Sequence, residues 1–180
     1  MMFSLSPPPV AAEAVAAAKS YLRIDTDPDD ALLASLLAAA VRHAETFINQ
    51  LILRREGVDR LAVNGGWQRL GATPVVAVTS VLGLPPDGPP VALPMDAYAL
   101  DIDGRGDGWI RLLAPGSAVR VDVTLEAGIA TDWSLIPEPL RLAVLRLVGH
   151  LYSHRDTTDD PGPPAAVAAL LRPWRRIRLA

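Results

Sequence analysis

The chain contains no cysteine among its 180 residues. This absence excludes disulfides, thiolate catalysis and cysteine-based zinc sites, and it is typical of a protein in a reducing compartment. The N-terminal stretch MMFSLSPPPV lacks the basic and apolar regions of a signal peptide. No uninterrupted apolar run reaches the length that spans a bilayer. We therefore expect a soluble, non-exported protein with no membrane partner.

Aromatic residues are also scarce, and positive charge does not exceed negative charge. Aromatics make up 5% of the chain, histidine occurs three times, and the net charge is −3 with a pI near 5.5. A protein that holds nucleic acid electrostatically is usually basic, so the composition argues against that class. Half of the residues are hydrophobic and 21% are charged. A chain of this length and composition can bury a proper core within one domain.

Apolar residues at helical spacing predict four helices. Three longer ones are expected over residues 10–22, 28–48 and 136–156, and a short one over 165–171. The apolar stripe of the second helix is continuous. It consists of Leu33, Leu36, Leu37, Ala40, Ala44 and Phe47.

Short runs rich in β-branched residues, separated by glycine and proline, occupy residues 51–128. They predict strands in RLAVN, VVAVTSVLGL, AYALDI, WIRLL and AVRVDVTLEAG. The expected fold class is α+β, mainly an α-helical bundle with a small antiparallel β-sheet insertion. We expect one domain over residues 1–156, followed over 157–180 by a flexible linker (TTDDPGPP), the short helix and a tail.

Four aspartates in the stretch DTDPDDALL admit three interpretations: a calcium loop, an acidic catalytic cluster or the start of a helix. A calcium loop that starts at Asp25 requires glycine at its sixth position and glutamate at its twelfth, where this chain has Asp30 and Leu36. Asp27 before Pro28 fits a helix N-cap followed by proline in the first turn. We therefore predict that Asp27 caps the second helix and that the cluster binds no metal.

His150 and His154 are the best candidates for metal ligands, because residues four apart share a helix face. The zinc-protease pattern requires glutamate directly after the first histidine, and the chain has Leu151 there. A packed or hydrogen-bonded pair of histidines is the simpler interpretation. No G-x-S-x-G motif and no dinucleotide-binding loop occurs. We predict no catalytic residue, no metal and no cofactor, with a metal-dependent hydrolase that uses His150 and His154 as an alternative.

The C-terminal tail combines arginine with large apolar residues. The residues concerned are Arg172, Trp174, Arg175, Arg176, Ile177 and Arg178. They are consistent with a solvated end, with a docking segment, or with a nucleic-acid contact in a regulatory module. Arginine and tryptophan are favoured at interface anchors, so we predict a docking segment. Because the linker is polar and rich in proline, we expect the tail to be loosely held in the isolated subunit.

Three blocks of the sequence together resemble the phage head–tail connector (adaptor) family. The first is AAAKSYLRIDTDPDDALLASLLAAAVRHAETF, the second is ATPVVAVTSV, and the third is VDVTLEAGIATDWSLIPEPLRLAVLRLVGHLYSHRD. Their order and spacing hold over about residues 10–156. The segments GIATDWSLIP and LLRPWRRIRL are most similar to the versions in gene transfer agents. One departure is that Asn49-Gln50 replaces the glycine turn that often follows the second helix.

The resemblance implies a non-enzymatic structural adaptor, so that residues 1–156 form the connector domain. Family members form a ring under the portal, usually a dodecamer, which extends the DNA channel and joins the capsid to the tail. The implied partners are the portal protein, tail-side connector or stopper proteins, further copies of the chain, and DNA that passes through without sequence-specific binding. We expect a monomer in isolation, assembly in the cytoplasm, and a final place in the neck of a phage or gene-transfer-agent particle.

Overall fold

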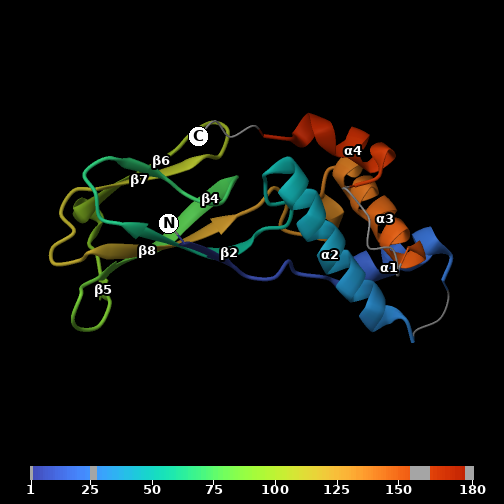
Figure 1. Ribbon diagram of the computed structural model, residues 1–180, viewed down its shortest axis with the longest axis horizontal. Coiled ribbons are helices and arrows are strands. Elements are labelled where there is room, and N and C mark those ends of the chain that lie inside the picture. The colour runs from blue at the N-terminus through green and yellow to red at the C-terminus, as the bar shows by residue number, and fades with distance from the viewer. Residues whose placement is uncertain (1, 25–27, 155–162, 177–180) are drawn as a thin grey trace. The chain divides into compact units, whose positions relative to one another are not determined.

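The computed structural model describes residues 2–24, 28–154 and 163–176. The chain divides into two compact units, each assembled from segments that are distant in sequence. Met1–Ser6 and Arg54–Gly128 form the β unit, and Pro7–Leu53 and Ile129–Ala180 form the helical unit. The chain therefore leaves the helical unit after α2, builds the β unit, and returns to the helical unit before α3 (Figure 1).

The helical unit is built around α2. It contains α1 (Ala12–Leu22), α2 (Asp30–Ile48), α3 (Glu138–Ser153) and α4 (Ala165–Leu171), with a 3₁₀ turn at Trp133–Leu135 before α3. Helix α2 contacts each of the other three helices, and α3 contacts α1 and α4 (Figure 1). The largest fully buried side chains in this core are Leu33, Leu37, Ile48, Ile52, Leu140, Leu147 and Leu171.

Helix ends in this unit follow local chemistry. Arg23 follows α1 and Asn49 follows α2, and both capping residues adopt the left-handed conformation, with φ of 57° and 55°. Asparagine accepts this conformation more easily than most residues because its short polar side chain bonds locally. An ion pair of 2.8 Å between Lys19 Nζ and Asp30 Oδ1 links the last turn of α1 to the first residue of α2.

Among the described helices, α2 alone is long and apolar enough to cross a membrane by length and composition. The sequence-based expectation that no run reaches this length was therefore too strict. Helix α2 buries one face, including Leu33, Leu37 and Ala40, against the other helices of its unit. This is how the core helix of a folded domain packs, and we assign α2 to that role.

The larger sheet of the β unit is five-stranded and antiparallel, with the order β1-β2-β8-β4-β5. Its strands are β1 (Met2–Leu5), β2 (Arg55–Ala62), β4 (Val75–Leu84), β5 (Val91–Ala92) and β8 (Arg120–Ala127). Strand β8 is central and alternates as predicted, with Val121, Val123 and Leu125 fully buried. Residue Val119, predicted on the same face, is 53% exposed because it precedes the strand.

A second, three-stranded antiparallel sheet has the order β3-β7-β6. Its strands are β3 (Trp67–Arg69), β6 (Tyr98–Ile102) and β7 (Gly108–Leu112), and a 3₁₀ turn at Met95–Ala97 precedes β6. The turn between β6 and β7 is held by Asp103, whose Oδ1 accepts the N–H groups of Arg105 (2.8 Å) and Asp107 (2.9 Å). The sequence Arg105-Gly106-Asp107 is thus part of a hairpin turn.

The predicted fold class of a mainly helical bundle with a small sheet insertion is wrong. The described residues hold four helices and eight strands in two antiparallel sheets, with 38% helix and 29% strand. The error arose because β1, β3 and β5 have only four, three and two residues. Strands this short carry no periodicity, and they form because a partner strand pairs with them.

Candidate functional site

The acidic cluster lies at the start of α2, and the structure describes part of it. Asp27 lies outside the described residues, so its role as N-cap stays a prediction. Asp29 occupies the position before the helix and makes no side-chain cap hydrogen bond. Asp30 is the first helical residue and pairs with Lys19. The described aspartates therefore serve the helix dipole and the link between α1 and α2.

His150 and His154 lie at the C-terminal end of α3. Their rings stack with centroids 4.4 Å apart, and His154 Nδ1 lies 3.1 Å from the carbonyl oxygen of His150. Within residues 2–24, 28–154 and 163–176, no three His, Asp or Glu side chains are grouped so that they could hold a metal ion. The described geometry gives the alternative of a metal-dependent hydrolase no support.

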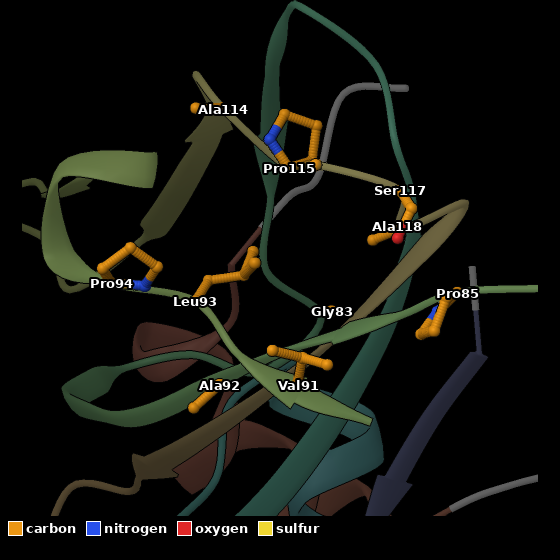
Figure 2. Close-up of a pocket in the computed structure, with 11 residues that line it drawn as sticks. Gly83, Pro85, Val91, Ala92, Leu93, Pro94, Ala114, Pro115, Ser117 and Ala118 are labelled. Carbon is orange, nitrogen blue, oxygen red and sulfur yellow. The ribbon is translucent and has the colours of Figure 1, made fainter. Parts of the chain in front are cut away.

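An open pocket of about 260 Å³ lies in the β unit (Figure 2). Three segments line it: the end of β4 with Pro85, residues 91–94, and residues 114–118. The lining is apolar and rich in proline, and Ser117 supplies its one side-chain hydroxyl. No titratable side chain lines it, so this pocket offers no acid, base or metal ligand for catalysis.

The described part of the tail is held by the helical unit. A 3₁₀ turn over Arg172–Trp174 follows α4, and Trp174 packs, partly buried, against the helical core. The Arg176 N–H donates to the carbonyl of Ile48 at 2.9 Å. The Arg175 guanidinium carbon lies 5.5 Å from the centre of the Phe47 ring, at cation–π distance. For residues up to Arg176, the expectation of a loosely held tail is therefore wrong.

The predicted docking residues thus divide into two groups. Arg172, Trp174, Arg175 and Arg176 are described, and the last three contact the C-terminal end of α2 or the residues that follow it. Ile177 and Arg178 lie outside the described residues. Arg172 and Arg175 are exposed, and Trp174 and Arg176 are half-buried. Docking by these residues stays a prediction.

Sequence reasoning missed one candidate protein-binding surface, the outer face of the three-stranded sheet. Trp67 pairs with Arg111, and Arg69 pairs with Trp109. The Arg69 guanidinium lies 6.0 Å from the Trp109 ring centre and forms a 2.7 Å ion pair with Asp107. Trp67 is 47% exposed. The repeated pattern W-x-R was the available signal, but only the pairing of β3 with β7 joins its two copies.

Asp59 is a fully buried carboxylate in β2. Its Oδ2 accepts the N–H of Gly71 at 2.6 Å, whereas its buried Oδ1 has no hydrogen-bond partner among the described residues. Burial raises the pKa of Asp59 above 3.8, and the hydrogen bond from Gly71 opposes this rise without cancelling it. The Asp59 side chain connects β2 to the turn before β4, which is a structural role.

We expect the Asp59→Asn variant to lose part of the pH dependence of folding stability. The raised pKa means that folded protein binds this proton more tightly than unfolded protein does. The Asp59 contribution to the free energy of unfolding therefore falls as pH rises from 3.8 through the folded pKa. Urea unfolding at pH 3.5 and pH 7 should show that Asp59→Asn gains stability relative to the wild type at the higher pH. The exposed Asp101→Asn variant is the control, and equal pH dependence of the two variants would contradict the assignment.

Residues 13–75 match the family described as phage gp6-like head–tail connector proteins. This region runs from the second residue of α1 through α2 to the first residue of β4. No curated protein sequence matches the chain.

Three of the solved chains that are similar to this one match it over its whole length. A chain from the neck of an empty gene transfer agent particle, computed with C6 symmetry, is 26% identical, with a TM-score of 0.78. A chain from the virion of a native gene transfer agent particle is 27% identical, with a TM-score of 0.74. A chain from the neck of a native particle, computed with C12 symmetry, is 26% identical, with a TM-score of 0.74. Each alignment covers 100% of this chain and 98% of the other chain.

Proposed function

We propose that this chain, which is a head–tail connector of the kind found in phages and gene transfer agents, forms the ring that joins a capsid portal to the tail. The observation that carries the proposal is the full-length similarity, in both units, to chains from gene transfer agent particles. The match to the connector family over residues 13–75 points in the same direction. The chain is a structural adaptor that connects head and tail.

The described side chains suit protein contacts. The W-x-R face of the small sheet and the arginine-rich tail both present Arg and Trp, the residues enriched at interface hot spots. We propose that the tail docks on the portal protein and that other surfaces contact neighbouring copies and tail-side proteins. Assembly would take place in the cytoplasm before the ring becomes part of the particle neck.

The proposed ring contains twelve copies around the path of the DNA. Two of the similar chains come from necks computed with six-fold and twelve-fold symmetry, which supports a ring of this order. Tight binding of DNA requires that many phosphates are neutralised by Lys and Arg. A net charge of −3 per chain favours a lumen through which DNA slides.

Electron microscopy of the protein mixed with its portal ring tests this function. We expect an added ring of twelve subunits on the tail side of the portal, in register with the symmetry of the portal. A preparation in which the folded protein never associates with portal rings would contradict the proposal. Mixing with DNA alone at low and high salt is the control, and tight salt-dependent binding would favour the nucleic-acid-binding alternative.

We expect the protein to be monomeric or weakly associated when it is purified alone. The apolar faces of α2 and α3 are already buried within one subunit, so they leave no large apolar surface that requires a partner copy. The subunits are then expected to close into a ring only when they assemble on the portal ring. Light scattering at micromolar concentration measures the mass, and a stable closed dodecamer without portal would contradict this expectation.

A further inference from the structure

Residues at and just after the C-terminal end of α2 form hydrogen bonds with the main chain of the tail. We call Phe47, Ile48, Asn49 and Gln50 the α2 clasp. The Asn49 Nδ2 group donates to the Arg176 carbonyl at 2.9 Å, and the Gln50 Nε2 group donates to the Trp174 carbonyl. The Ile48 carbonyl accepts the Arg176 N–H at 2.9 Å. Three hydrogen bonds therefore hold the main chain of the segment from Trp174 to Arg176.

The geometry of the helix end explains why these residues can act together. The last carbonyls of a helix have no partner within the helix, and that of Ile48 is one of them. Asn49 adopts the left-handed conformation with φ of 55°, which ends the helix. Gln50 follows with its side chain buried. The two amide groups then meet a chain segment more than 120 positions away in sequence.

The hydrogen bonds of the clasp engage main-chain groups of the tail and no tail side chain. Its hydrogen bonds reach carbonyl and N–H groups, and Trp174 rests partly buried on the helical core. Arg172 and Arg175 stay exposed, although Arg175 lies over the Phe47 ring. Guanidinium groups presented in this way match carboxylates on a partner, with which they form charge-assisted hydrogen bonds.

We propose that the α2 clasp is a positioning site, in which Asn49 and Gln50 hold Trp174–Arg176 in one conformation. The tail is then already ordered when it binds an acidic surface of a partner protein. This inference rests on the proposed docking of the tail. A segment that is ordered before binding loses less conformational entropy when the complex forms. Asn49 and Gln50 therefore raise the affinity for the partner without contacting it.

The test replaces both amides and retains the backbone and packing. In the Asn49→Gly, Gln50→Met variant, glycine keeps the left-handed conformation, and methionine keeps the length of glutamine without its donor. We expect trypsin to cleave after Arg175 and Arg176 about ten-fold faster, because the released segment opens more often. We also expect the variant to bind the portal ring about ten-fold more weakly, with a circular dichroism spectrum like that of the wild type.

Two further variants make the result decisive. Gln68→Met is the matched control, because Gln68 Nε2 donates to the Ala62 carbonyl in the β unit, far from the tail in sequence. Asn49→Gly alone should give an intermediate increase in cleavage and an intermediate loss of portal affinity. It provides the same test if the double variant does not fold. Unchanged cleavage, or faster cleavage with unchanged portal affinity, would overturn the positioning role. Normal portal binding by a chain without residues 172–180 would contradict the proposed docking function. The trypsin cleavage rates of the Asn49 and Gln50 variants would still show whether the clasp holds the tail.

Discussion

Capsids assembled with a connector that lacks Arg172–Ala180 will package DNA, leak it and carry no tails. This is the largest functional effect that we expect from any change in the chain. The deleted segment contains four arginines together with Trp174 and Ile177. Arginine and tryptophan are the types that dominate binding energy at protein interfaces, and loss of several anchors together removes most of it. Electron microscopy of particles and a nuclease-protection assay of packaged DNA measure the outcome.

The deletion needs a control because it removes a residue that also packs in the folded subunit. Trp174 packs partly against the helical core, so its removal lowers the stability of the helical unit somewhat. A second variant, with the exposed Arg172 and Arg175 changed to glutamine, keeps Trp174 and removes two charges. We expect it to fold like the wild type and to attach to the portal more weakly, most clearly at low salt. Normal tails on particles made with the deletion would show that the segment has no docking role.

The Leu140→Ala variant will lose about 2–5 kcal/mol of folding stability. Leu140 lies in α3, is fully buried and belongs to the helical core. The substitution removes three carbons where surrounding side chains relax only in part, which leaves a cavity. Since domains of this size are stable by only about 5–15 kcal/mol, the loss is a large share of the total. Urea denaturation followed by circular dichroism measures it.

Leu135→Ala is the matched control for this change. It removes the same atoms five residues earlier, but Leu135 is 64% exposed in the turn before α3. We expect its effect to stay within about 0.5 kcal/mol, as for other surface substitutions. A similar loss in both variants would mean that Leu140 is not buried in the folded protein as the structure places it.

The helices were predictable because their signal is local. The apolar stripe of the second helix is visible in the sequence, and α2 buries Leu33, Leu37, Ala40 and Ala44 of that stripe. The helix runs over Asp30–Ile48, against the predicted 28–48. The short helix at Ala165–Leu171 has the predicted bounds. Side chains three and four residues apart share a helix face, so a single segment carries the whole pattern.

The sheets were only partly predictable because strand pairing is not local. Strand β4 has the predicted bounds, since its ten residues carry enough β-branched side chains to be recognised. Strand β1, which follows no such pattern, pairs with β2 more than fifty residues later. Its four residues became a strand because β2 offered an edge. The balance between helix and sheet was misjudged for this reason.

The sequence by itself determined which family the chain resembles, the absence of cysteine chemistry and the residue types of the tail. It contains three blocks that resemble the connector family, and the whole chain aligns with neck chains of gene transfer agents. Only the tertiary structure decided that Trp174–Arg176 rests on the α2 clasp and that the two W-x-R motifs share one face. These contacts join residues that are about 40 to 127 positions apart. Separations of that kind leave no local periodicity, and chain folding alone brings such residues together.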